Sequence, residues 1–325
     1  MKQAKYLVEN DFMADPAVHV FNGKLYIYPS HDRESGIPEN DNGDHFDMND
    51  YHVFSTSDIE NEALTDHGVV LKTRDIDWAG RQLWDCDVAF KNGKYYMYFP
   101  LKDRTDIFRL GVAISNNPAG PFIAQPDPIR GSYSIDPAVF QNTDGVHYMY
   151  FGGLWGGQLQ RYRDNKALEC AYLPSGDESA LPSRVVLLSD DMLDFAEEPR
   201  PVFLLNKDGS PMKARQTEKR FFEASWMHRY NDKYYFSYST GDTHLLCYAT
   251  GDNPYGPFTY QGVIMTPVVG WTTHHSIVEF KSKWYLFHHD SIPSGGKTWL
   301  RSLKVVELEY TQDGTIKTIN GSSQL

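Results

Sequence analysis

The sequence is poor in cysteine and in positive charge. Its 325 residues include three cysteines, Cys86, Cys170 and Cys247, whose wide spacing provides neither a disulfide framework nor a CxxC metal site. With 31 Lys and Arg against 43 Asp and Glu, the formal net charge is −12, which argues against binding to nucleic acid or to an anionic membrane. These features exclude the disulfide-rich class and the basic nucleic-acid-binding class.

Long apolar runs are also missing. The opening residues MKQAKYLVENDFMADPAV contain no run long enough for a signal peptide, and no later segment is long enough to span a bilayer. We therefore expect a cytoplasmic protein with no membrane partner. Hydrophobic residues still make up 41% of the chain, which is enough for a full core.

Aromatic residues and turn formers are abundant. Aromatic side chains account for 14% of the chain, with 21 Tyr and 7 Trp, and there are 25 Gly and 18 Pro. Aromatic residues favour strands, while Gly and Pro favour turns. The composition therefore predicts an all-β fold.

One pattern recurs five times along the chain. Each copy has a leading acidic or His residue, a short alternating apolar run, a polar turn and an aromatic run, as expected for a β-hairpin. The copies are DPAVHVFNGKLYIY from Asp15, DCDVAFKNGKYYMY from Asp85, DPAVFQNTDGVHYMY from Asp136, EASWMHRYNDKYYFSY from Glu223 and HHSIVEFKSKWYLF from His274.

The rest of each unit also repeats. Segments 51–58, 111–122, 185–191 and 245–258 are predicted third strands, and 68–71 and 262–265 are predicted fourth strands. Four short strands per unit are typical of the blades of a β-propeller. The sequence predicts a five-bladed β-propeller that forms a single domain over residues 1–325, with blade entries near the five leading residues. A β-sandwich is the alternative, but sandwiches do not repeat one polar residue at each hairpin entry.

Two polar stretches interrupt the repeat. Residues 31–50 and 159–183 are expected to be loops, either as solvated surface or as rims that shape a pocket. The acidic cluster within 40–50 lacks the ligand spacing of an EF-hand, so it is not counted as a calcium site.

The leading residues are expected to meet at one mouth of the central channel. Carboxylates that gather in a low dielectric repel each other, so a protein keeps them for chemistry or for a cation. A hydrated calcium ion held mainly through water is one expectation at this axis. A water-filled channel, with His274 hydrogen-bonded to Asp136 or Glu223, is the other. A single Asp-Pro would need no functional explanation, because proline is tolerated at the start of a strand.

Three carboxyl groups at one mouth suit glycoside hydrolysis. That reaction uses one carboxylic acid to protonate the leaving oxygen and one carboxylate to activate water or to act as nucleophile. A third carboxylate can hold the pKa of the acid high. Trp84 and Trp155 lie near blade entries and are candidate platforms for sugar rings, although single tryptophans are more often part of a core.

Several segments together resemble glycoside hydrolase family 43. They are ADPAV near the N-terminus, SIDPAVF in the middle, FFEASWM before a YYFSYS strand, HHSIVEF, and the closing RSLKVVELEYTQDGTI. The resemblance covers essentially the whole chain. It implies a five-bladed propeller and an inverting mechanism on arabinose- and xylose-containing plant saccharides, with no cofactor required for the chemistry.

The resemblance also implies roles for individual residues. Asp15 would be the general base, Glu223 the general acid, and Asp136 the residue that tunes and orients the acid. Arg301 would contact substrate. His274 would lie at the axis, often beside calcium, with His275 as its close competitor.

The second blade departs from the family pattern. The family usually has Trp-Ala-Pro-Asp there, whereas this chain has Trp84-Asp85-Cys86-Asp87. Asp85 is thus an extra acid of open role, and Asp87 is expected to be structural. Related propellers that act on fructosides use different motifs and are disfavoured.

The function expected from the sequence is that of an inverting exo-glycosidase, a β-xylosidase with α-L-arabinofuranosidase activity. Its expected partners are short xylo- or arabino-oligosaccharides. An endo-α-1,5-arabinanase of the same family is one alternative, because loops such as 31–50 decide between a groove and a pocket. A carbohydrate-binding propeller without catalysis is the alternative from another class.

Overall fold

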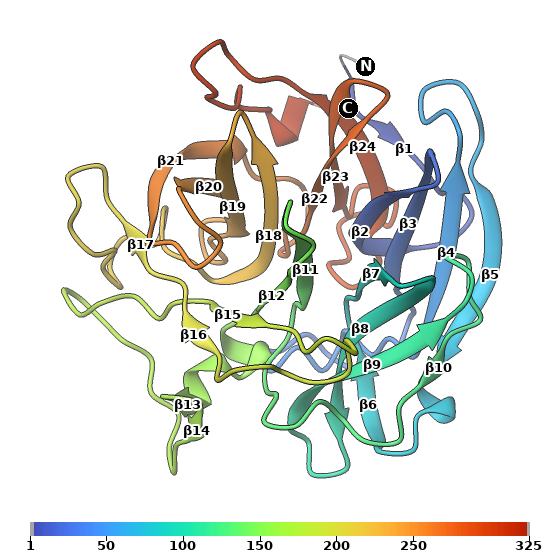
Figure 1. Cartoon of the computed structure of the whole chain (residues 1–325), viewed down its shortest axis with the longest axis horizontal. Coiled ribbons are helices and arrows are strands. Elements are labelled where there is room, and N and C mark those ends of the chain that lie inside the picture. The colour runs from blue at the N-terminus through green and yellow to red at the C-terminus, as the bar shows by residue number, and fades with distance from the viewer. Residues whose placement is uncertain (1–2, 324–325) are drawn as a thin grey trace.

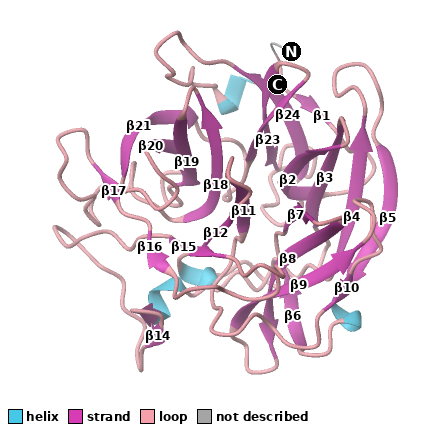
Figure 2. Cartoon of the chain, in the orientation of Figure 1, coloured by secondary structure: helices cyan, strands magenta, loops and turns pink. Residues whose placement is uncertain are grey.

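The computed structural model describes residues 3–323, in which five sheets of mainly antiparallel strands are arranged as blades around a central axis (Figure 1). Adjacent innermost strands contact each other in the order β2, β7, β11, β18, β22 and back to β2, which closes the ring. The predicted all-β five-bladed propeller is confirmed. Helices within residues 3–323 are short 3₁₀ segments, none long or apolar enough to span a membrane (Figure 2).

The first three blades follow the chain order from the axis outward. Blade 1 contains β2 (Met13–Phe21), β3 (Lys24–His31), β4 (Asp50–Thr56) and β5 (Thr65–Lys72). Blade 2 contains β7 (Asp87–Lys91), β8 (Lys94–Asp103), β9 (Phe108–Ser115) and β10 (Ile123–Ala124), with β6 (Ala79–Leu83) also paired to β8. Blade 3 contains β11 (Ala138–Gln141), β12 (His147–Phe151), β15 (Arg184–Leu187) and β16 (Arg200–Pro201).

The last two blades each include a strand from elsewhere in the sequence. Blade 4 contains β18 (Glu223–Tyr230), β19 (Lys233–Ser239), β20 (Leu246–Gly251) and β21 (Phe258–Met265), with β17 (Leu204–Leu205) parallel to β21. Blade 5 contains β22 (Ser276–Phe280), β23 (Lys283–Asp290) and β24 (Ser302–Leu308), and its outer strand is the N-terminal β1 (Lys5–Tyr6). The two ends of the chain therefore meet in one sheet.

The two predicted interruptions have different structures. Residues 32–49 contain no regular strand, as expected for a loop. The stretch 159–183 is more ordered than a simple loop, because it includes the small hairpin of β13 (Tyr162–Arg163) and β14 (Lys166–Ala167). The 3₁₀ segments are η1 (Thr73–Asp75), η2 (Trp155–Gly157), η3 (Leu159–Arg161) and η4 (Gly321–Ser323).

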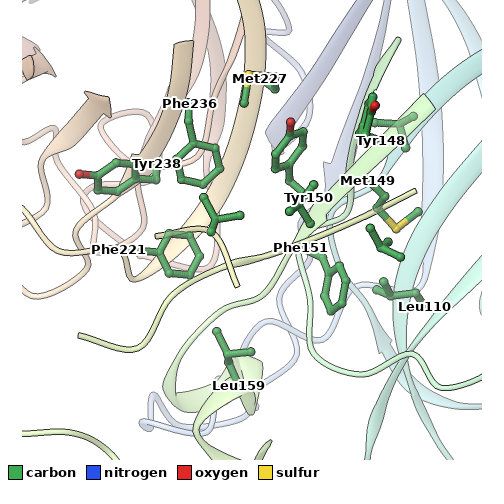
Figure 3. Close-up of a cluster of buried hydrophobic side chains, with 14 of the residues drawn as sticks. Leu110, Tyr148, Met149, Tyr150, Phe151, Leu159, Phe221, Met227, Phe236 and Tyr238 are labelled. Atoms are coloured by element: carbon green, nitrogen blue, oxygen red, sulfur yellow. The ribbon is translucent and has the colours of Figure 1, made fainter. Parts of the chain in front are cut away.

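Aromatic side chains fill the wedges between blades. Figure 3 shows one such cluster, in which Tyr150 of β12 lies near Phe236 of β19. Tyr238 and Phe221 lie beside Phe236, and Phe151 follows Tyr150 on β12. All five are buried. This packing explains the high aromatic content, because large flat rings bury much surface between sheets that splay apart from the axis. It also holds the innermost strands, and thus the axial side chains, in place.

Candidate active site

A pocket of about 400 Å³ opens at one mouth of the channel. Its lining combines residues from the starts of all five innermost strands with residues from the rim. The structure brings together every residue that the sequence singled out as a site candidate: Asp15, Trp84, Asp85, Asp136, Trp155, Glu223, His274 and Arg301.

The strands that carry two of these residues are irregular at the carboxyl groups. The pairing of β2 with β3 shifts between Ala14 and Ala17, and that of β18 with β19 shifts between Glu223 and Trp226. Asp15 and Ala224 have positive φ angles of 46° and 60°. A bulge of this kind bends the strand and re-aims its side chains, so it turns the carboxyl groups toward the pocket.

Asp15 is buried and surrounded by hydrogen-bond donors. Its carboxylate accepts from Nη1 of Arg301 at 2.6 Å and from Oγ of Ser30 at 2.8 Å, and its backbone N–H donates to Nδ1 of His289 at 3.1 Å. Burial opposes ionisation, but the charge of Arg301 and the other partners outweigh it and lower the pKa of Asp15 to about 2. Asp15 is therefore a carboxylate at any ordinary working pH.

Arg301 is held by a second carboxylate, Asp32. Its Nε and Nη2 each donate to Asp32 at 2.8 Å, and so does its backbone N–H. This bidentate contact fixes the plane of the guanidinium group, so that Nη1 points at Asp15. Neither Asp32 nor His289 lies in a recognised motif, so the sequence alone did not point to them. Arg301, which was expected to contact substrate, also pairs with two carboxylates, those of Asp15 and Asp32.

Glu223 has the opposite electrostatic environment. Burial, followed by the negative charges of Asp136 and Asp15, raises the pKa of Glu223 well above its ordinary value. Asp136 accepts a hydrogen bond from the backbone N–H of Ala224, the next residue, at 2.6 Å. Asp136 is thereby fixed beside Glu223, where its charge acts on that carboxyl group.

Asp85 and Asp87, the two acids of the unusual second-blade motif, lie in different surroundings. Asp85 lines the pocket, and burial together with the charge of Asp136 raises its pKa well above its ordinary value. Asp87 instead accepts hydrogen bonds from Nε2 of His19 and from the backbone N–H of Val139, both at 2.5 Å. These partners belong to the innermost strands of the two neighbouring blades, which matches the structural role expected for Asp87.

The fold places the adjacent residues His274 and His275 in different environments. His274 lines the pocket, with Nδ1 3.6 Å from Oδ1 of Asp15. His275 is buried behind it, with Nε2 2.6 Å from Oγ of Ser237. The pocket histidine is thus His274, and the carboxylate within 4 Å of its ring is that of Asp15 rather than that of Asp136 or Glu223.

Aromatic rings form two walls of the pocket. On one side, the ring of Trp155 lies 5.4 Å from Phe222 and 5.5 Å from Trp271, measured between centroids. Trp84 packs against Phe108 and donates its indole N–H to the carbonyl of Phe46, so it is both a core residue and part of the lining. Such faces suit the apolar sides of sugar rings.

The loop of residues 31–50 forms the rim of the pocket, and lining residues include Glu39, Asn40 and Asp41. The loop packs against η2, which also contributes to the lining of the pocket. A β-carbon on Gly156 would lie 2.8 Å from the carbonyl oxygen of Asn42, so only glycine permits this approach. Of the two roles expected for this loop, solvated surface or pocket rim, the structure shows the pocket rim. The other interruption, 159–183, contributes to a separate pocket.

A channel-mouth pocket that lowers the pKa of one carboxyl group and raises the pKa of another is the arrangement that glycoside hydrolysis uses. The chain matches the family model described as glycosyl hydrolases family 43 over residues 6–316. It belongs to that family and is a glycoside hydrolase, as the resemblance in the sequence implied.

Individual relatives are similar over their full length. A Bacteroides ovatus protein named xylosidase/arabinosidase is 73% identical over 322 residues, which cover 99% of this chain and 99% of that protein. A structure of RS223-β-xylosidase has a TM-score of 0.98 at 73% identity, covering 99% of this chain and 100% of that one. CoXyl43, a β-xylosidase/α-arabinofuranosidase from a compost microbial metagenome solved with xylotriose in a calcium-free form, has a TM-score of 0.96 at 58% identity over 98% of each chain.

Proposed function

We propose that this chain is an inverting exo-glycosidase that releases xylose and arabinose from short plant-derived oligosaccharides. The observation that carries the proposal is the contrast between Asp15, whose pKa is lowered to about 2, and Glu223, whose pKa is raised, in one pocket. Two carboxyl groups whose pKa values are shifted in opposite directions usually serve as the base and the acid of such a reaction. The names of the relatives support xylosides and arabinosides as the substrates.

In the proposed mechanism, Asp15 takes a proton from a water molecule as its oxygen attacks the anomeric carbon. Glu223 gives its proton to the glycosidic oxygen as the bond to the leaving sugar breaks. Asp136 keeps Glu223 protonated through its charge. Arg301 holds Asp15 in position and has donors within reach of sugar hydroxyls. The water adds from the face opposite the leaving group, so the anomeric configuration inverts.

Exo action is supported by the contact across the rim. Gly156 and Asn42 come together at one side of the pocket, and this contact would narrow the path of a polymer through it. A volume of about 400 Å³ is at the small end of ligand pockets. Both features favour a terminal sugar over an internal segment, and so disfavour an endo-arabinanase.

The test is hydrolysis of an aryl β-xyloside and an aryl α-arabinofuranoside beside debranched arabinan, with proton NMR of the first anomer released. We expect both aryl glycosides to be cleaved with inversion and the arabinan to be left largely intact. Asp15→Asn should abolish turnover on every substrate, while Glu223→Gln should slow natural oligosaccharides far more than activated aryl glycosides. Retention of configuration, or a separation of about 5 Å between the two carboxyl groups in a crystal structure rather than roughly 6.5–9.5 Å, would contradict the mechanism.

We also propose a structural calcium ion at the axis, beside His274. One donor atom each of Asp85, Asp136 and His274 lies within 4.8 Å of the others, and within residues 3–323 Oδ1 of Asp85 is buried with no hydrogen-bond partner. Carboxylate oxygens are ligands that calcium prefers, whereas imidazole is an unusual one, so His274 would act mainly through water. When bound, the ion would supply positive charge that offsets the clustered carboxylates.

Chelation followed by addition of calcium tests this second proposal. We expect activity and the unfolding temperature to fall together on chelation and to recover together when calcium is restored. Unchanged activity and stability, with no metal found by elemental analysis, would mean that water and hydrogen bonds alone hold the axis.

A further inference from the structure

A second group of metal-binding side chains lies on blade 1, outside the pocket. His31 ends β3, and Asp50 and His52 lie two residues apart near the start of β4. Ser30 pairs with Tyr51, and continuing this register places His31 opposite Asp50. Residues i and i+2 of a strand share a face, and a directly opposite residue shares it too. The pairing of β3 with β4 therefore sets these three side chains on one face of the blade.

The side-chain geometry agrees with the strand register. One donor atom from each of His31, Asp50 and His52 lies within 4.8 Å of the others. The two imidazole rings are 4.8 Å apart between centroids and nearly perpendicular, at 72°. All three side chains are partly shielded, with 15–22% of their surface exposed, so an ion could reach them without unfolding the blade.

Each histidine is held from outside the group by a further carboxylate. Nε2 of His31 is 3.2 Å from Asp11, and Nδ1 of His52 is 3.3 Å from Asp66. Metal-binding histidines commonly donate their second ring N–H to a carboxylate in this way, which fixes the tautomer and strengthens the ligand. The arrangement leaves Nδ1 of His31 and Nε2 of His52 as the nitrogens for an ion, and Nδ1 of His31 is already 2.6 Å from Oδ1 of Asp50.

We propose that His31, Asp50 and His52 form a zinc-class metal site on blade 1, with Asp11 and Asp66 orienting the two histidines. Two imidazole nitrogens and one carboxylate oxygen, with water in a fourth position, are a normal ligand set for Zn²⁺ and a poor one for calcium. Zinc bonds of about 2.0–2.2 Å place ligand atoms roughly 3.3–3.5 Å apart, so the side chains need to shift by about 1 Å.

The position gives the site a structural consequence. Its neighbours in the sequence, Ser30 and Asp32, hold Asp15 and Arg301 in the pocket. An ion that ties the end of β3 to the start of β4 would restrain the segment that carries both contacts. We therefore expect zinc to stabilise the folded chain, since a ligand that binds only the native state raises its stability.

The experiment is calorimetric titration of chelator-treated protein with Zn²⁺ in the presence of excess calcium, which occupies oxygen-rich sites. We expect one zinc ion per chain and a rise in unfolding temperature. His52→Ala should weaken binding by about 100-fold or more and remove the thermal shift, and Asp66→Asn should weaken binding by about tenfold.

Two control variants make the outcome decisive. His67 lies on the same blade and bonds to Ser55. His67→Ala should keep both the zinc binding and the thermal shift. His274→Ala changes the pocket histidine and should also keep them. Zinc binding that survives in both His52→Ala and His31→Asn, or that disappears in His274→Ala, would overturn the proposal. Co²⁺ gives a further readout, because tetrahedral cobalt absorbs visible light and should do so only in variants that retain the site.

Discussion

At the scale of single residues, acidity in the pocket depends on neighbours. Asp15 and Glu223 are both buried, yet Arg301 lowers the pKa of Asp15 whereas Asp136 raises that of Glu223. Because Asp15 protonates only near pH 2, it should impose no loss of activity between pH 4 and 7. The loss at alkaline pH should come from Glu223, which must be protonated to act as an acid.

Replacing Asp136 should therefore move the alkaline limb of the pH profile. The burial of Glu223 remains in Asp136→Asn, but the largest negative charge acting on it is removed, so the pKa of Glu223 falls and activity is lost at lower pH than in the wild type. The measurement is kcat/KM against pH on an unactivated oligosaccharide. Asp41→Asn, at the rim, is the matched control and should leave the limb in place. An alkaline limb that stays still, or moves upward, in Asp136→Asn would contradict the role given to Asp136.

Asp32 is predicted to be a positioning residue. Asp32→Asn keeps the size of the side chain but removes the charge that aligns Arg301, and a misplacement of about 1 Å at a reacting group can cost about 100-fold. We expect kcat/KM to fall by roughly 10–100-fold. Asp290→Asn is the control, because Asp290 is equally buried but pairs with Lys304 and Tyr6 away from the pocket. Both variants should lose stability, and only Asp32→Asn should lose activity; equal activities would rule out the positioning role.

At the scale of elements, Asp87 joins the innermost strands of three blades. It starts β7, and its carboxylate accepts from His19 on β2 and from the N–H of Val139 on β11. Asp87→Ala leaves the buried N–H of Val139 and the partly buried ring of His19 without this acceptor, and an unsatisfied buried donor costs about 1–3 kcal/mol. We expect the free energy of unfolding to fall by roughly 3 kcal/mol in denaturant titrations. Asp87→Asn retains one acceptor and should cost less, so an equal loss in the two variants would show that packing, not hydrogen bonding, matters there.

At the scale of the whole molecule, the ring is closed by the N-terminal strand. Residues Lys5 and Tyr6 pair with Val305 and Lys304 of β24, and the hydroxyl of Tyr6 donates to Asp290 at 2.9 Å. Deleting residues 1–6 should lower the unfolding temperature, because it exposes the edge of β24 and removes Tyr6, one partner of the buried Asp290 carboxylate. Tyr6→Phe removes the hydroxyl alone and should cost about 1–2 kcal/mol. A deletion no more harmful than Tyr6→Phe would mean that strand closure adds nothing to the stability of the propeller.

The sequence by itself determined the fold class and the five polar residues that meet at the axis. Hairpins are local, so their alternating apolar residues and polar turns can be read directly, and five copies with a polar leader predict five blades with those leaders at the axis. Asp15, Asp136 and Glu223 were identifiable for that reason.

Tertiary structure alone decided which side chains surround those leaders. Asp32 and Arg301 are 269 residues apart, and no local pattern links them. The choice of His274 over His275 depends on which ring faces the axis, and the shape of the rim depends on Asn42 meeting Gly156. The group of His31, Asp50 and His52 arises because a long loop returns the chain to pair β4 with β3. Contacts between distant segments depend on how the blades close, and periodicity within a hairpin carries no information about them.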